Sequence, residues 1–102
     1  MKVFISQPMR GKTDEQIRKE RNKVVTKLKR YYGDDAEILD TIFNLDEGAH
    51  PLVYLGKSIE VLSEADLIYF MEDWDIARGC VIEHEVACRY GIKRIFEGGM
   101  MI

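Results

Sequence analysis

Residues 73–83 of this 102-residue chain gather side chains that can do chemistry: acids, an indole and a guanidinium. Asp73, Trp74 and Asp75 follow a hydrophobic run at 67–71, and a helix-like pattern from about residue 78 carries Glu83. A strand that leads into a helix delivers such residues to the carboxyl end of a sheet, where open α/β folds bind ligands. We therefore predict that the functional site lies at this junction.

Glu83 is the first candidate for a catalytic role. It falls about one turn into the expected helix, where the positive end of the helix dipole and the nearby Arg78 would favour its ionised form. An ionised carboxylate in a cleft can attack a sugar carbon or stabilise an oxocarbenium-like transition state. The alternative is an ordinary solvated glutamate, which spacing alone favours because most helical glutamates do no chemistry.

A second group of polar residues follows the first hydrophobic run, at 3–5. Ser6, Gln7, Arg10 and Gly11 precede an expected helix. A guanidinium and the free backbone amides of a helix start suit a phosphate or a carboxylate. The alternative is a Pro-Gly turn with an exposed arginine.

Residues near Glu83 are candidates for binding and positioning the substrate. Trp74 could stack on a base or ribose, or pack against the following helix. Asp75 is a candidate for protonating or positioning a leaving group, and Arg78 and Gly79 are candidates for binding substrate. No metal-ligand spacing, Walker motif or GxGxxG motif accompanies them, so no metal or cofactor is expected.

Hydrophobic periodicity predicts four strands alternating with three helices. This βαβαβαβ order is typical of a small doubly wound α/β fold, flavodoxin- or Rossmann-like, with a four-stranded parallel sheet. We expect residues 1–102 to form one domain. The expected strands are 3–5, 37–40, 67–71 and 94–96, and the expected helices are 13–32, 51–62 and 78–90.

Several local signals can be tested directly. Thr13 and Gln16 form a capping box that opens the first helix, and Gly33 ends it. Pro51 suits the first turn of the second helix. The expected buried face of that helix is Leu52, Leu55, Ile59 and Leu62. Gly91 is expected to end the third helix, and residues 98–102 read as an apolar tail.

Composition narrows the classes of partner. A net charge of −3 with 32% charged residues indicates neither a nucleic-acid polymer nor a membrane surface as partner. Cys80 and Cys88 lie eight residues apart on one helix, about 12 Å along its axis, which is too far for a disulfide. Free thiols, no signal peptide and no membrane-spanning run together indicate a cytoplasmic protein.

The helix motif that contains Glu83 resembles that of a known superfamily. Its spaced residues are Gly79, Glu83, Ala87 and Gly91. This pattern is similar to the G-x-x-x-E-x-x-x-A-x-x-x-G helix of nucleoside 2-deoxyribosyltransferases, a superfamily that includes 2′-deoxynucleoside 5′-monophosphate N-glycosidases. Residues 65–68 and 4–8 look like its central-strand entry and first loop. The chain is most like its small bacterial and phage members.

The resemblance implies a reaction and a set of roles. Glu83 matches the nucleophile that takes up the deoxyribosyl group, and the Arg10-Gly11 element matches one that contacts a 5′-phosphate. We therefore expect cleavage or transfer at a deoxynucleoside or its monophosphate, and, as in the family, a homodimer or larger assembly.

The chain also departs from the family: Phe4 stands where a tyrosine is usual, and Ser58 and Ala77 stand where aspartates are usual.

Two alternatives stay open. One is a nucleotide-binding module that kept the pocket and lost the chemistry, which Phe4 and Ser58 favour. The other is cleavage of NAD-like nucleotides, a reaction that also uses a glutamate on a comparable fold.

Overall fold

The structure is a computed structural model, and it describes residues 1–41, 48–98 and 100–101. Its parallel strands are β1 (Lys2–Ser6), β2 (Glu37–Ile38), β3 (Leu67–Phe70) and β4 (Lys93–Phe96), and β5 (Met100–Met101) follows them. The helices are α1 (Asp14–Tyr32), α2 (Pro51–Leu62) and α3 (Arg78–Tyr90), with a short 3-10 turn, η1 (Trp74–Ile76), before α3. Among the described helices, none is both long and apolar enough to cross a membrane.

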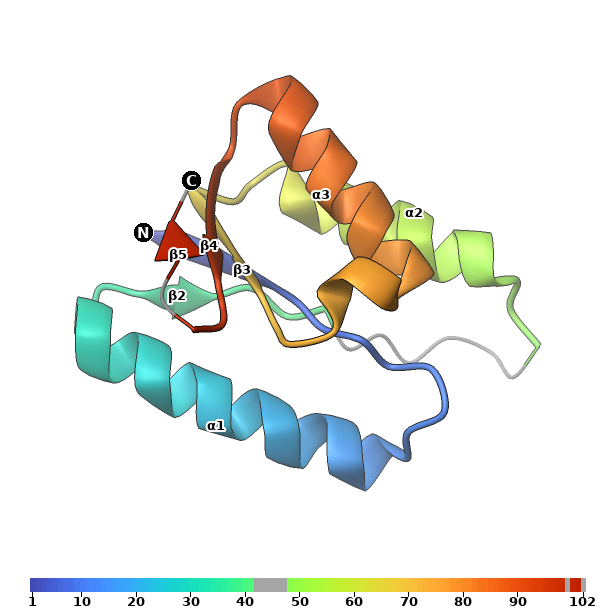
Figure 1. Ribbon diagram of the computed structural model, residues 1–102, viewed down its shortest axis with the longest axis horizontal. Helices are drawn as coiled ribbons and strands as arrows, with labels where there is room; N and C mark the ends of the chain where they lie inside the picture. Colours follow the sequence, from blue (N-terminus) through green and yellow to red (C-terminus); the bar gives the residue numbers. More distant parts are fainter. Residues whose placement is uncertain (42–47, 99, 102) are drawn as a thin grey trace.

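The strands form one sheet in the order β2-β1-β3-β4-β5 (Figure 1). β1 pairs in parallel with both β2 and β3, and β3 pairs in parallel with β4. This confirms the predicted fold, with four parallel strands and three helices. β5 pairs antiparallel with β4, so part of the expected apolar tail is a fifth strand. The glycine turn at 98 lets the chain fold back on the sheet edge, with φ +102° at Gly98.

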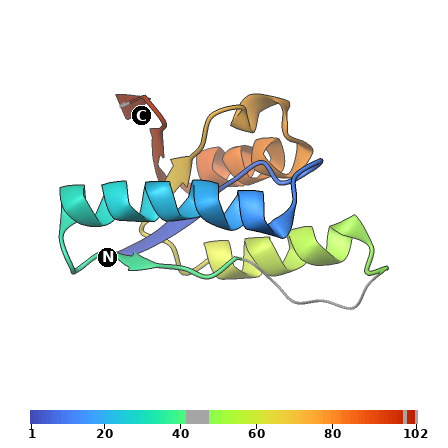
Figure 2. The ribbon, with the colours of Figure 1, turned by 90° about the horizontal axis from the view of Figure 1, so that it is seen from below.

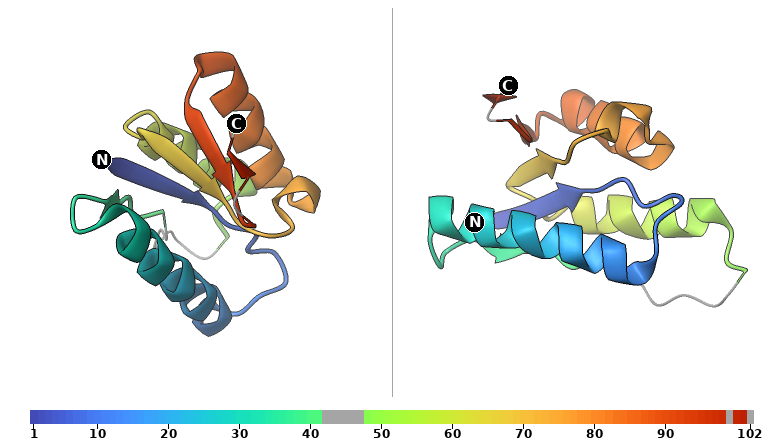
Figure 3. Two further views of the ribbon diagram at one scale, coloured as in Figure 1. Left: turned by 60° about the vertical axis from the view of Figure 1, so that its left-hand side comes forward. Right: turned by 60° about the horizontal axis from the view of Figure 1, so that its bottom comes forward.

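The helices cover both faces of the sheet. α1 lies on one face, and α2 and α3 lie on the other (Figure 3). Two clusters of buried residues correspond to these layers. Val3, Ile5 and Val24 belong to the α1 cluster, and Phe4, Ile68 and Leu62 belong to the cluster under α2 and α3. Alternate side chains of β1 therefore point to opposite layers, as in a strand covered on both faces.

Local sequence signals explain most helix boundaries. The Thr13 hydroxyl accepts the Gln16 amide, and the Gln16 side chain accepts the Thr13 amide, which completes the predicted capping box. α3 ends at Gly91, whose φ of +67° is a left-handed conformation that glycine adopts without steric cost. The start of α2 also follows the prediction, because Pro51 is in its first turn and His50 caps it.

The predicted packing face of α2 is confirmed at Ile59 and Leu62 but is wrong at Leu52. Leu52 was expected in the core, but its side chain is 65% exposed, while Leu62 at the other end of α2 is 1% exposed. The first turns of α2 project beyond the ends of the strands (Figure 1 and Figure 2), so they have no sheet to pack against. Helical periodicity shows which residues share a face, but not how far the sheet extends beneath it. The predicted loop after Thr41 falls mainly on residues 42–47, outside the described residues.

Candidate active site

The candidate site lies where the chain direction over the sheet reverses. The chain leaves β1 toward α1 on one face, and leaves the neighbouring β3 toward α3 on the other. Such a point separates the two connecting loops and opens a crevice at the carboxyl ends of the strands. An open cavity of about 1250 Å³ lies here.

Three segments and Thr41, which follows β2, line this cavity. The first segment is the end of β1 with the following loop and the start of α1, the second is the first half of α2 with His50 before it, and the third lies between Asp73 and Glu83. The predicted site residues on its wall are Gln7, Arg10, Arg78, Gly79 and Glu83. Residues far apart in the sequence therefore meet at one place, as the parallel topology predicts.

Glu83 lies on the inward face of α3, 7% exposed, at the wall of the cavity. Ser6, at the end of β1, donates a hydrogen bond of 2.7 Å from its Oγ to Glu83 Oε1. Ser6 is itself 1% exposed, so this bond is sealed beneath the cavity. The hydroxyl restricts the carboxylate to one orientation and leaves its other oxygen, Oε2, without that bond. Ser6 therefore fixes the orientation of the Glu83 side chain.

Burial controls the charge of Glu83. It raises the pKa of this carboxyl from its usual 4.5 to about 7, against the opposing effect of the Ser6 hydrogen bond. The expectation that Glu83 would be held in its ionised form is wrong, because desolvation is the largest effect on its pKa and raises it. At neutral pH Glu83 is divided between its carboxylate and its carboxylic acid, a poise suited to a group that changes its charge during a reaction.

Cys80 is a second buried titratable residue in the cavity wall. Burial raises the pKa of its thiol to about 11; the Ser6 hydroxyl opposes this and the neighbouring Glu83 adds to it. The thiol therefore stays protonated at neutral pH, and a protonated thiol is a poor nucleophile. Cys80 and Cys88 are both free, as predicted. Among residues 1–41 and 48–98, no three His, Cys, Asp or Glu side chains are grouped to hold a metal ion.

The predicted site residues in the loop after β1 differ in their surroundings. Gln7 is 6% exposed, and its Nε2 donates to the Ile17 carbonyl of α1 at 2.8 Å, which ties the loop to the helix. Arg10 is exposed at the cavity wall. Gly11 has φ +79° in the turn closed by the Lys12 amide and the Met9 carbonyl, and it does not border the cavity.

The start of α3 presents backbone donors to the cavity. Ala77 caps the helix without a side-chain hydrogen bond, and the first turn contains no acidic residue. Arg78 and Gly79 line the cavity there. An uncapped helix start with a guanidinium beside it favours an anion.

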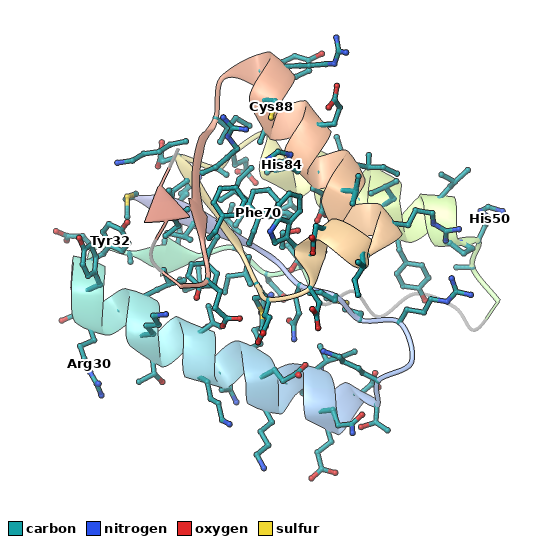
Figure 4. The ribbon with its side chains drawn as sticks, viewed as in Figure 1. Arg30, Tyr32, His50, Phe70, His84 and Cys88 are labelled. Carbon is teal, nitrogen blue, oxygen red and sulfur yellow. The ribbon has the colours of Figure 1, made fainter. Side chains whose placement is uncertain are left out.

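Trp74 packs rather than facing the cavity. Its ring lies 4.5 Å from the His84 ring and about 5 Å from those of Phe70 and Phe96, measured between centroids (5.1 and 5.3 Å). Phe70 and His84 lie together between β3 and α3 (Figure 4). Of the two readings of Trp74, packing against α3 matches this geometry. His84 follows Glu83 directly but belongs to this aromatic cluster, on another side of the helix.

The two acids beside Trp74 are placed differently. Asp73 borders the cavity, and its φ of +67° makes it the only non-glycine residue with positive φ in the described chain. Asp75 is exposed in η1 and does not border the cavity. A left-handed aspartate is uncommon, and such conformations are often found at functional sites.

Sequence reasoning missed two residues of the cavity wall. Thr41 follows β2 and is 5% exposed; its Oγ1 is buried and has no hydrogen-bond partner among the described residues. Tyr54 lies on α2, 37% exposed. Neither stands in a recognisable motif. The one available signal was position: Thr41 follows a strand of a parallel sheet, and such residues meet at the carboxyl edge.

The fold and the cavity define a small Rossmann-like α/β protein with a buried glutamate at its topological switch point. The profile of a family described as a domain of unknown function, DUF4406, matches residues 1–96, so the chain belongs to this family. No curated protein and no solved structure gave a match.

Proposed function

We propose that this protein cleaves the N-glycosidic bond of a deoxynucleoside or deoxynucleoside 5′-monophosphate, or transfers the deoxyribosyl group, with Glu83 as nucleophile. The observation that carries the proposal is the buried Glu83 carboxyl, oriented by Ser6 at the wall of the cavity. The position matches the glutamate of the deoxyribosyltransferase-like helix motif. The Ser6 hydroxyl orients the carboxylate through Oε1, and Oε2, which does not accept this bond, could attack an anomeric carbon.

The reaction would proceed in two balanced steps. In the first, ionised Glu83 forms an ester bond to the anomeric carbon while the bond to the base breaks; the base leaves with the electron pair and takes up a proton. In the second, water attacks the same carbon and gives up a proton, the ester bond breaks, and the carboxylate returns. A second base in place of water would give transfer. Two displacements at one carbon retain the configuration.

Asp73 is better placed than Asp75 to assist the leaving base. Both acids precede α3, but only Asp73 borders the cavity. A carboxyl group within reach of the base could donate the proton or orient a ring nitrogen. If Asp73 has this role, Asp73→Asn should slow base release while Glu83 stays in place.

Three arginines at the cavity favour a substrate that carries an anionic group. Arg10 in the loop after β1, Arg18 on α1 and Arg78 on α3 all reach the cavity, and none has an ion-pair partner in the described part of the chain. Guanidinium groups at the uncapped start of α3 would hold a 5′-phosphate. This favours a nucleotide over a nucleoside.

The deciding experiment incubates the full chain with a panel of deoxynucleoside 5′-monophosphates, the matching nucleosides and NAD, and measures free base by chromatography. The proposal expects base release by the wild type and none by Glu83→Ala. Adding a second free base separates hydrolysis from transfer. Release from NAD alone would identify the NAD-like alternative, and equal release by Glu83→Ala would sink the proposed nucleophile.

A non-catalytic nucleotide-binding module is the second candidate. Phe4 and Ser58 both border the cavity, and neither offers an ionisable group where the related enzymes carry a tyrosine and an aspartate. Tight nucleotide binding without base release, by the wild type and Glu83→Ala alike, would establish this function instead.

We also propose that the protein is a cytoplasmic homodimer. Leu52, Val53, Ile76, Val81 and Ile82 are apolar and between 37% and 81% exposed, on α2 and at the α3 end of the cavity. Exposed apolar side chains of this size favour association when a partner covers them. Light scattering tests it: the wild type should have twice the chain mass, and Val53→Glu with Val81→Glu should restore the monomer. A monomeric wild type would refute the dimer.

A further inference from the structure

A substrate that carries a base would bind best against an aromatic side chain, and Trp74 does not offer one to the cavity. The Trp74 ring is packed among Phe70, His84 and Phe96, and it does not border the cavity. Phe4 does border the cavity, but its side chain is 1% exposed and is part of the core beneath α2 and α3. Neither ring therefore offers an open face.

Tyr54 is the aromatic residue with both exposure and position. Its side chain is 37% exposed, and Pro51, Tyr54, Leu55 and Ser58 all border the cavity. These positions follow the spacing i, i+3, i+4, i+7, so they share one face of α2. Tyr54 therefore lies on the face that α2 turns to the cavity, where α2 projects beyond the strands.

The Tyr54 ring has no partner within the described chain. No ring contact, cation–π contact or hydrogen bond involves it. A half-exposed aromatic ring on a helix that faces a large cavity, with both its face and its hydroxyl uncommitted, is suited to stacking on a planar ligand. Glu83 reaches the same cavity from α3.

We infer that Tyr54 is the residue that stacks on the base of the substrate and so selects ligands that carry a planar heterocycle. The inference rests on the proposed function for the identity of the ligand. It places the base beside α2 and the scissile bond beside α3. Stacking on one aromatic side chain tolerates different bases, so Tyr54 would favour a ring over no ring rather than one base over another.

Calorimetric titration of Glu83→Gln protein tests the inference without turnover. The probes are dAMP and dCMP, which carry a base, and 2-deoxyribose 5-phosphate, which has none. In this background, Tyr54→Leu keeps apolar bulk and Tyr54→Phe keeps the ring. We expect Tyr54→Leu to weaken binding of both nucleotides about tenfold, to leave 2-deoxyribose 5-phosphate unchanged, and Tyr54→Phe to bind like the parent.

Three outcomes overturn the inference. Tyr54→Leu could weaken all three probes equally, which would mean a general change in the cavity. A second is that Tyr54→Leu weakens the binding of none of the probes. A third is that neither nucleotide binds the Glu83→Gln parent protein. Trp74→Leu is the comparison, and selective loss of the nucleotides there would assign the stacking to Trp74. Nucleotides that bind through Tyr54 but are never cleaved by the wild type would refute the proposed reaction alone.

Discussion

The Ser6 hydroxyl at the end of β1 donates a 2.7 Å hydrogen bond to Glu83 Oε1 on α3, between residues 77 positions apart in the chain. The bond crosses the point where the two halves of the fold diverge. It lowers the pKa of Glu83, whereas burial raises it to about 7. The protonation of the proposed nucleophile therefore depends on a contact between the first strand and the last helix.

Ser6→Ala should shift the pH dependence of activity. Without the hydroxyl, desolvation acts unopposed, and the pKa of Glu83 rises further above its present value near 7. Activity that needs the carboxylate should then appear at higher pH, and its value at pH 7 should fall about tenfold or more, as for loss of a hydrogen bond to a charged group. The measurement is the pH–rate profile. Ser58→Ala, which removes a hydroxyl not bonded to Glu83, is the control and should leave the acid limb in place; an unmoved limb in Ser6→Ala would show that Ser6 does not set this pKa.

Glu83→Gln should make the protein more stable at alkaline pH. The folded-state pKa is raised above the unfolded value, so the carboxyl favours folding most below about pH 4.5, and this contribution is lost as the pH rises through about 7. The loss amounts to roughly 3 kcal/mol of unfolding free energy. Gln cannot ionise, so denaturant titrations at pH 5 and pH 8 should show a smaller pH-dependent loss in the variant. An equal loss in both proteins would mean that Glu83 is not desolvated.

Gly79→Ala should weaken ligand binding without harming the fold. A Cβ added at Gly79 meets no protein atom within 4 Å, and the residue borders the cavity at the start of α3. The methyl group would therefore enter the space that an anion needs to reach the backbone amides. Thermal melting should stay within a few degrees of wild type while nucleotide affinity falls about tenfold.

Gly56→Ala is the matched control for that change. Gly56 is also helical, a Cβ there also meets nothing within 4 Å, and the residue does not border the cavity. This variant should gain about 0.5–1 kcal/mol of stability from helix propensity and bind nucleotide like wild type. Equal affinity in the two glycine variants would remove Gly79 from the binding site.

Arg10→Met should discriminate between nucleotide and nucleoside. The substitution removes one guanidinium from the site proposed to bind the 5′-phosphate. The KM for a deoxynucleoside monophosphate should rise about tenfold or more, the scale of a charge-assisted hydrogen bond. The KM for the nucleoside should change little. Arg30→Met, in the exposed last turn of α1 and outside the cavity wall, controls for net charge. A uniform effect on both substrates would mean that Arg10 does not bind the phosphate.

Local patterns were enough to predict the three helices and four parallel strands of this protein, but not β5. The boundaries of α3, the capping box at Thr13 and the buried strand at 67–70 depend on neighbours a few residues away, and the α/β topology follows from their alternation. The motif register also pointed to Glu83 among the glutamates of the chain. These properties require no knowledge of which segments meet.

Tertiary structure alone decided the chemistry of the site. Whether Glu83 is ionised depends on desolvation by the packed sheet and on Ser6, and burial reverses the sign expected from the helix start. Long-range packing likewise leaves Leu52 without a sheet beneath it, packs Trp74 against the core and brings Asp73, Thr41 and Tyr54 to the cavity. The physical reason is that dielectric environment and mutual distance are set by residues far apart in the chain, and no local pattern encodes them.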